Sequence, residues 1–237
     1  ADNTNDMLTG FLTLRIGRYR EQFTEHFAKQ LNPERSLRSL LFFAALYHDV
    51  CKPETKTMDD NGRIRFFDHD MKGAQVAAQR AEALRLSNDE VQRVKVIIEH
   101  HMRFHFHTSR MEGEGKDPSR KAIYRFFRDV GEAGVDLVLL GLADLRGTRA
   151  NTITQDGWIA ALDIARILLE NYFERPQEII APPRLLNGNE LMQELGISPS
   201  PLVGDLLETI REGQATGRVS TREQAIELAR EKLLARK

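Results

Sequence analysis

The sequence has little cysteine, no long apolar run and no excess of charge of either sign. Its single cysteine, Cys51, excludes an intramolecular disulfide, which suits a reducing cytoplasm. No signal peptide is recognisable, and no apolar stretch approaches the roughly 20 residues that a membrane-spanning helix needs. Lysine and arginine total 34 against 35 aspartate and glutamate residues, so RNA binding would require a local basic patch. We expect a cytoplasmic chain without a membrane segment, and the sequence leaves its oligomeric state open.

The spacing of apolar residues predicts an all-α fold. Ser87 and Glu90 form a capping-box pattern that begins one of the helices, and Asn61-Gly62 indicates one short hairpin within residues 53–68. The glycines of residues 108–118 favour a mobile surface loop. The predicted helices of the main bundle cover about residues 12–31, 35–49, 69–84, 88–101, 119–130, 132–147 and 156–174.

The last quarter of the chain is predicted to form a separate module. Ala181-Pro182-Pro183 has the composition of a linker, and frequent glycine and proline divide the residues that follow it into three short helices. Thr221 is the expected N-cap of the last helix. We therefore expect a helical domain at residues 1–180 and a small helical module at residues 184–237.

Histidine and aspartate residues at the ends and inside of apolar helices indicate a metal site. The apolar run 41–50 contains the pair His48-Asp49 near its end, and Pro53 prevents the helix from continuing. Helical bundles build metal sites from inward-facing side chains of several helices. Imidazole and carboxylate ligands suit Mn, Ni, Co, Fe or Zn, and a carboxylate can bridge two ions. The candidate ligands are His48, Asp49, His69, His100, His101 and Asp144.

Each candidate also has a structural explanation. Asp144 lies in the apolar segment 138–144, where a charge is costly unless it is paired, and Arg146 or Arg149 could pair with it. Adjacent helical residues point to different sides, so only one of His100 and His101 is expected to face a metal. His48-Asp49 could be a helix end that faces solvent, and His100-His101 could be cations favoured by the dipole at a helix C-terminus. His69 could belong to the start of the next helix. His105 and His107 lie in the alternating sequence Phe104-His105-Phe106-His107, which predicts that both face water and are not ligands.

Further motifs accompany the metal-site candidates. They are His48-Asp49-Val50-Cys51-Lys52-Pro53, Gly62 to Asp70, Arg85-Leu86-Ser87-Asn88, His100-His101-Met102, Ala143-Asp144, Leu185 to Met192 and Pro201-Leu202-Val203-Gly204. Together these motifs resemble the HD superfamily of metal-dependent phosphohydrolases, which is named after its His-Asp pair. The resemblance is closest to the C-terminal HD region of bacterial tRNA nucleotidyltransferases and poly(A) polymerases. It implies one or two divalent ions, with Mg also possible, and hydrolysis of a phosphoester such as a nucleotide or a 2′,3′-cyclic phosphate.

The resemblance also assigns roles to residues. It implies that Asp49 and Asp144 anchor metal, that His48 completes the first site, and that His69 with His100 or His101 holds a second ion or the phosphate. Lys52 either neutralises phosphate charge during the reaction or is an ordinary cation at a helix C-terminus.

Two features depart from the family pattern. The chain has no Gly-Gly dipeptide and no counterpart of the polymerase catalytic head, so we expect no nucleotide addition by this chain alone. His26 is the one candidate in this sequence for the histidine that precedes the pair in the family. At 1.5 Å per residue it would lie about 10 Å from the helix–helix turn, whereas His48 would lie about 20 Å from it. Whether His26 or residues before Ala1 provide that ligand stays open, as does whether the chain is a fragment of a longer polymerase.

The alternative function is a catalytically weak or inactive tRNA-binding part of a nucleotidyltransferase-like polymerase. Its support is the basic set Arg120, Lys121, Arg125 and Arg128, which shares a predicted helix with Tyr124, Phe126 and Phe127. An amphipathic helix with buried aromatic residues and solvated arginines explains the same pattern.

Overall fold

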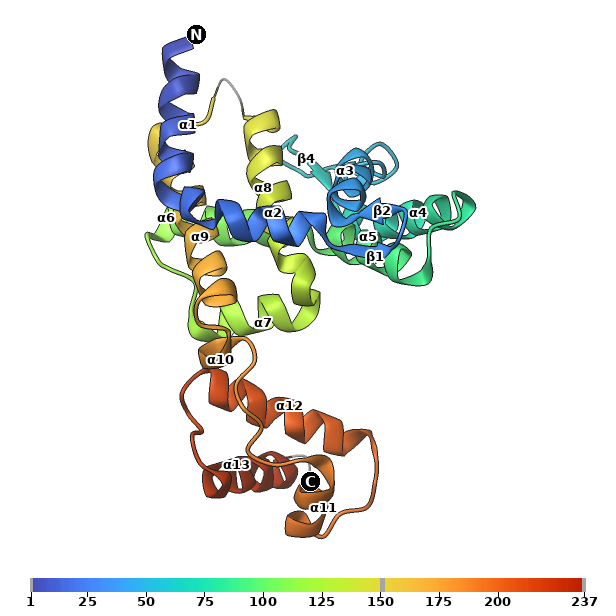
Figure 1. The fold of residues 1–237 in the computed structure, drawn as a ribbon, viewed down its shortest axis with the longest axis vertical. Coiled ribbons are helices and arrows are strands. Elements are labelled where there is room, and N and C mark those ends of the chain that lie inside the picture. Colours follow the sequence, from blue (N-terminus) through green and yellow to red (C-terminus); the bar gives the residue numbers. More distant parts are fainter. Residues whose placement is uncertain (1, 150–151, 236–237) are drawn as a thin grey trace. The chain divides into compact units, whose positions relative to one another are not determined.

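The computed structural model describes residues 2–149 and 152–235, and it is built almost entirely of helices (Figure 1). Helices account for 71% of the chain, and the strands within the described residues form two short antiparallel hairpins. This confirms the predicted all-α fold. No helix among the described residues is both long enough and apolar enough to cross a membrane.

The chain divides into two compact units, which we describe separately. Unit 1 comprises residues 1–117 and 130–169, and unit 2 comprises residues 118–129 and 170–237. The division into folding domains at residues 181–183 stays a prediction. The elements that belong wholly or mainly to unit 1 are α1 (Asp2–Ile16), η1 (Gly17–Tyr19), α2 (Arg20–Ala28), β1 (Gln30–Asn32), β2 (Arg35–Ser36), α3 (Leu37–Tyr47), β3 (Lys56–Met58), β4 (Ile64–Phe66), α4 (His69–Ala83), α5 (Asn88–His100), α6 (Met102–Glu114), η2 (Gly131–Ala133), α8 (Gly134–Thr148) and α9 (Gln155–Phe173).

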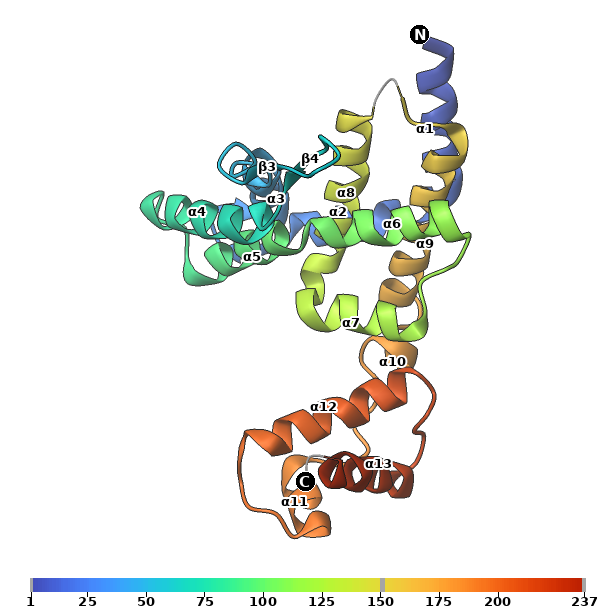
Figure 2. The same cartoon turned by 180° about the vertical axis from the view of Figure 1, so that it is seen from behind.

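Helix α3 lies at the centre of the part of unit 1 that positions the candidate site. It packs against α4, α5 and α8, and α6 packs against α8, as both ribbon views show (Figures 1 and 2). Leu40 and Ala44 of α3 are buried, as are Val94 and Ile98 of α5. Burying each large aliphatic side chain contributes about 1.5–3 kcal/mol, so the apolar faces of these helices fix the polar residues at their ends.

The start of α5 shows how local sequence positions these helices. Ser87 and Glu90 form the predicted capping box, and the guanidinium of Arg35 donates to both carboxylate oxygens of Glu90 at 2.8 and 3.1 Å. Glu90 is fully buried, so this paired charge fastens the residues before α3 to the first turn of α5.

Three sequence predictions differ from the structure in unit 1. The first predicted helix is interrupted by the 3-10 turn η1 and ends at Ala28, and a second hairpin, β1–β2, surrounds Pro33 where none was expected. The predicted loop at residues 108–118 is wrong because α6 continues to Glu114. Arg110 and Glu114 form an ion pair one helical turn apart, and Gly115 ends the helix in the left-handed conformation.

Unit 2 contains α10 (Pro176–Ile179), α11 (Gly188–Leu195), α12 (Pro201–Ala215), α13 (Arg222–Leu234) and all but the last residue of α7 (Arg120–Val130). Leu191, Leu206, Ile210 and Ala225 form its buried core with other apolar residues of α11–α13. The three short helices predicted after residue 184 are confirmed, and Thr221 caps α13 as expected.

Candidate metal centre

His48 and Asp49 follow directly after α3, as the sequence predicted from Pro53. His48 is the C-cap of the helix, and the chain then turns through hydrogen bonds from the Val50 and Lys52 amides to the carbonyls of Tyr47 and Asp49. The buried face of α3 therefore determines where the His-Asp pair lies.

Three histidines point the same ring nitrogen toward Asp49. In His48, His69 and His101, Nδ1 lies 2.6–2.7 Å from the backbone carbonyl oxygen three residues earlier in the chain. A carbonyl oxygen can only accept, so Nδ1 carries the proton and donates, and Nε2 of the neutral ring presents a lone pair. Metal-binding histidines are held by this kind of backbone hydrogen bond, which fixes both the tautomer and the direction of the ring.

Asp49 Oδ1 forms the first ligand group with His69 and His101. Its distances to the two Nε2 atoms are 3.6 and 3.7 Å, and the two Nε2 atoms are 3.2 Å apart. Burial is the main reason that the pKa of His101 falls to about 4, so its ring is neutral at pH 7. Three acceptors thus face one another, and ligand atoms about 2.1 Å from one tetrahedral ion would be about 3.4 Å apart. The group fits a divalent cation.

Asp49 also belongs to a second ligand group with His48 and Asp144. His48 Nε2 lies 3.4 Å from Asp49 Oδ2 and 3.6 Å from Asp144 Oδ1. Several buried side-chain atoms of the described residues lack a hydrogen-bond partner, and Asp49 Oδ1, His48 Nε2 and His105 Nε2 are among them. Such atoms are costly unless a ligand satisfies them. Asp49 is therefore shared by two groups that could each hold a metal ion.

His105 joins this cluster, although its sequence context indicated a water-facing side chain. Its Nε2 lies 2.8 Å from Asp144 Oδ2, and this contact, with help from His48, holds the pKa of the Asp144 carboxyl far below its usual range. Burial lowers the pKa of His48, but the Asp144 carboxylate and other partners raise it overall. Phe104 to His107 are helical rather than extended, so the alternation that suggested a strand is misleading. The useful signal is the four-residue spacing of His101 and His105, which places both on one helix face.

Comparisons with known proteins show which proteins this chain is similar to. A family model described as "HD domain" matches residues 19–133. This chain carries an HD domain. It is 36% identical over 194 residues to a CC-adding tRNA nucleotidyltransferase of Thermus thermophilus, which covers 81% of this chain and 39% of that protein. It is 34% identical over 187 residues to an A-adding tRNA nucleotidyltransferase of Deinococcus radiodurans, which covers 78% of this chain and 40% of that protein.

The chain spans about two fifths of the length of these two relatives. The resemblance to the HD superfamily and to tRNA nucleotidyltransferases is confirmed.

Lys52 of the HD domain contacts Asp49 directly. Its Nζ lies 2.6 Å from Asp49 Oδ2 and 5.7 Å from the centre of the Phe66 ring. The sequence suggested either a group near the His48-Asp49 pair that neutralises phosphate charge or a solvated cation at the helix end. Neither interpretation included an ion pair between Lys52 and Asp49. The ammonium group therefore lies beside Asp49 Oδ2, the oxygen that also faces His48. A metal ion held by His48, Asp49 and Asp144 would share the Asp49 carboxylate with Lys52.

Several sequence candidates lie outside the two ligand groups. His100 belongs to neither group, because His101 is the one of the adjacent pair that faces Asp49. His26 is buried on α2, where its Nε2 lies 3.1 Å from Asp136 Oδ2, and Arg93 donates to the same oxygen. It is thus engaged away from the His48-Asp49 pair, as its position along the helix suggested.

The proposed ion pairs of Asp144 with nearby arginines are not formed. Arg149 pairs with Glu112 at 3.7 Å, and the Arg146 guanidinium lies over the ring of Trp158. Asp144 instead faces His48 and His105, because α8 turns it toward α3 and α6 rather than toward the end of its own helix.

Close packing of α6 on α8 brings His105 to Asp144. Gly141, one turn before Asp144, lies against the Phe104 ring, and an added Cβ would come within 2.8 Å of Phe104 Cβ and closer still to the ring. We expect Gly141→Ala to lower the free energy of unfolding by about 1–3 kcal/mol through overpacking. Chemical denaturation measures this loss. Gly147→Ala is the matched control on the same helix, because nothing lies within 4 Å of its Cβ position. An equal effect of both substitutions would contradict the packing explanation.

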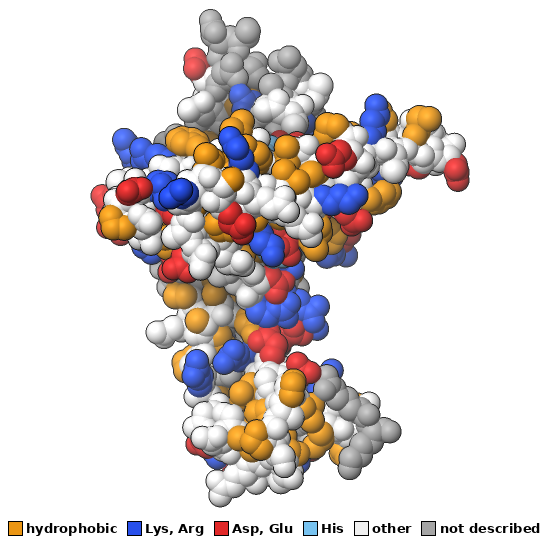
Figure 3. Space-filling view, turned by 90° about the vertical axis from the view of Figure 1, so that its right-hand side faces the viewer, with side chains coloured by type: hydrophobic (Ala, Val, Ile, Leu, Met, Phe, Trp, Pro, Cys, Tyr) orange, Lys and Arg blue, Asp and Glu red, His pale blue; other side chains and the backbone are white. Residues whose placement is uncertain are grey.

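The basic residues of α7 in unit 2 are already engaged. Glu212 of α12 accepts from Arg125 Nε at 2.7 Å and pairs with Lys121 at 2.8 Å, and Arg120 Nε donates to the Ala215 carbonyl oxygen at 2.8 Å. Arg128 contacts Asp129 and Glu208, while the aromatic side chains of the helix are buried. On the face seen in Figure 3, basic and acidic side chains are interspersed. The α7 arginines therefore act mainly within unit 2.

Proposed function

We propose that this HD domain is a divalent-metal-dependent phosphohydrolase whose centre is Asp49. The observation that carries the proposal is the convergence of lone-pair nitrogens and carboxylate oxygens on Asp49, with each histidine oriented by a backbone carbonyl. Asp49, His69 and His101 would hold one ion, and His48, Asp49 and Asp144 would hold another. The donor set suits Mn, Fe, Co, Ni or Zn better than Mg, which prefers oxygen ligands.

The residues around Asp49 have distinct roles in this proposal. A divalent ion supplies Lewis-acid activation of water and of a phosphoryl oxygen. Lys52 lies beside Asp49 Oδ2, where its charge offsets the negative charge that develops on phosphate oxygens during attack. His105 keeps Asp144 ionised and directed toward His48. We propose small phosphoesters, such as nucleotides or 2′,3′-cyclic phosphates, as substrates.

A hydrolysis assay tests the proposal directly. The purified chain is incubated with Mn, Ni, Co or Mg and with a general phosphodiester or a 2′,3′-cyclic nucleotide. We expect metal-dependent release of product, and loss of at least 100-fold in rate in Asp49→Ala, because both ligand groups lose a member; removing one catalytic group from an active site costs about this much or more. Asp117→Ala, which removes an exposed carboxylate from the α6–α7 connection, is the control. Equal rates in the wild type and Asp49→Ala would refute the hydrolase proposal.

A second candidate function is tRNA binding as part of a longer nucleotidyltransferase-like protein. The observation that favours it is the similarity to two tRNA nucleotidyltransferases over about four fifths of this chain. The pairing of the α7 cations within unit 2 argues against that helix as the binding surface.

We expect Arg125→Gln to leave salt-sensitive tRNA binding nearly unchanged, because its guanidinium is committed to Glu212. Loss of this exposed pair should lower stability by at most about 1 kcal/mol. Filter binding and thermal denaturation measure the two effects. A large loss of tRNA affinity without a change in stability would restore α7 as an RNA contact.

A further inference from the structure

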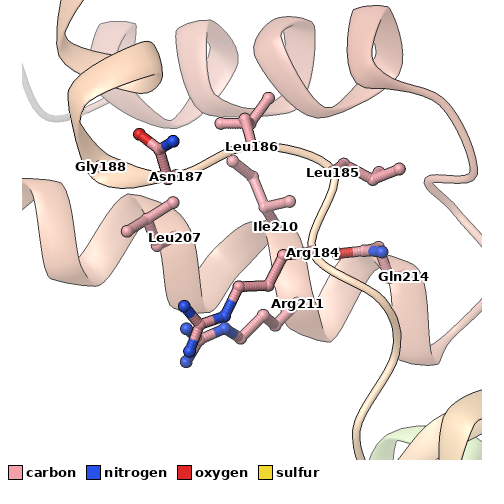
Figure 4. A pocket seen from close by; sticks show the side chains of 9 residues that line it. All are labelled: Arg184, Leu185, Leu186, Asn187, Gly188, Leu207, Ile210, Arg211 and Gln214. Carbon is pink, nitrogen blue, oxygen red and sulfur yellow. The ribbon is translucent and has the colours of Figure 1, made fainter.

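A small pocket in unit 2 is lined by two arginines (Figure 4). Residues 184–188 form one wall and α12 forms the other, with Arg184 and Arg211 extending in the same direction in the close-up view. The floor is aliphatic and includes Leu207 and Ile210. The pocket belongs to unit 2, whereas the candidate metal centre belongs to unit 1.

Packing within unit 2 places the two arginines at the same pocket. Gln214 Nε2 donates to the carbonyl oxygen of Pro183 at 2.7 Å, which fixes the residue before Arg184 against α12. On the other side of Arg184, Leu186 is buried in the core of unit 2. Arg211 lies three residues before Gln214, so one helical turn separates the anchor from the second arginine. The fold of unit 2 therefore sets the backbone positions from which both arginines extend.

Nearby carboxylates are already committed to other cations. Glu208 accepts from the Tyr124 hydroxyl and pairs with Arg128, and Glu212 is occupied by Lys121 and Arg125. Within the described part of the chain, neither Arg184 nor Arg211 forms an ion pair or a side-chain hydrogen bond. Two guanidinium groups at one pocket without a counterion form an anion-binding arrangement.

We propose that Arg184 and Arg211 bind a phosphate group. Each guanidinium can present two parallel N–H donors to phosphate oxygens, a geometry that a lysine ammonium lacks. Leu207 and Ile210 offer an aliphatic surface for the sugar attached to the phosphate. The pocket is small, with a volume of about 70 Å³, and has no aromatic residue in its lining, whereas sites for free small molecules are large enough to enclose most of their ligand. This favours a phosphodiester of a nucleic-acid strand over a free nucleotide. The inference does not rest on the proposed hydrolase activity.

Binding of a fluorescein-labelled single-stranded oligoribonucleotide to the whole 237-residue chain tests this proposal. Fluorescence anisotropy is measured over a range of salt concentrations in EDTA, so that no metal is held at Asp49. We expect Arg184→Gln/Arg211→Gln to weaken binding at least about tenfold and to reduce the slope of log K against log salt by about 1.4, or 0.7 for each lost phosphate contact. Arg184→Lys/Arg211→Lys, which keeps the charge but loses the fork geometry, should have an intermediate affinity.

The matched control removes the same charge elsewhere in unit 2. Arg218→Gln/Arg230→Gln changes two arginines that pair with Glu231 and Glu227 and do not line the pocket. We expect the control to bind like the wild type. Competition by AMP at similar concentrations would assign the site to a free phosphate monoester, and lack of competition would assign it to the phosphodiester strand; both support a phosphate site. Absence of binding, unchanged binding in the Gln pair, or an equal loss in the control pair would overturn the proposal.

Discussion

Replacement of Asp49 by alanine is expected to remove metal binding at both ligand groups, whereas replacement of Asp144 should affect only one. Asp49 presents Oδ1 to His69 and His101, and Oδ2 to His48. Of the two ligand groups, Asp144 belongs only to the one that contains His48. Two histidines, or one histidine with one carboxylate, would remain after the loss of Asp49, too few ligands for a stable site of the usual four-coordinate kind.

Metal content and metal-dependent stability together measure this difference. The metal bound per chain is determined after dialysis against Mn²⁺ or Ni²⁺. Thermal unfolding is followed with and without the ion, because an ion that binds only the folded state at 100 times its Kd stabilises it by about 2.7 kcal/mol. This increment should vanish in Asp49→Ala and persist in part in Asp144→Ala. If Asp49→Ala kept the full increment, a bridging role for Asp49 would be wrong.

Local sequence signals were sufficient to predict much of the centre. The end of α3 followed from an apolar run closed by Pro53, and this placed His48 and Asp49 at a helix end. Asp144 was recognisable because a charge inside an apolar helix requires a partner. The capping pattern of Ser87 and Glu90 predicted the start of α5 correctly. These features depend on residues within a few positions of one another, so no tertiary information was needed.

The remaining features depend on contacts between distant segments. Whether His100 or His101 faces Asp49 depends on which side of α5 packs on α3. The sequence alone does not specify that side. The pairing of Arg125 with Glu212 joins residues 87 positions apart. The alternation of Phe104 to His107 was interpreted with the strand period, whereas these residues lie within helix α6. His105 was missed for this reason.

His105 is expected to be a positioning residue for Asp144, and its removal should weaken metal binding selectively at the group that contains Asp144. The contact at 2.8 Å is shorter than the distance of 3.6 Å between His48 and the same carboxylate, so His105 has the stronger influence on its orientation. Loss of a residue that orients a ligand typically lowers metal affinity 10- to 100-fold. We expect about this loss in His105→Ala and partial recovery in His105→Gln, whose amide N–H can donate to the carboxylate.

A carboxyl titration distinguishes this positioning role from a general loss of stability. His105 is the largest of the causes that depress the pKa of Asp144, so His105→Ala should raise that pKa toward its usual value near 4 in metal-free protein. A carboxyl group whose pKa is lower in the folded protein than in the unfolded chain stabilises the folded state above the unfolded pKa, and this stabilisation is lost as pH falls through the folded pKa. The free energy of unfolding of His105→Ala should therefore depend less on pH in acid than that of the wild type. Titration of the Asp144 carboxyl carbon by NMR and Mn²⁺ binding by calorimetry provide the two readouts. His107→Ala, on the same helix but outside both ligand groups, should change neither; an unchanged Asp144 pKa in His105→Ala would contradict the role assigned to His105.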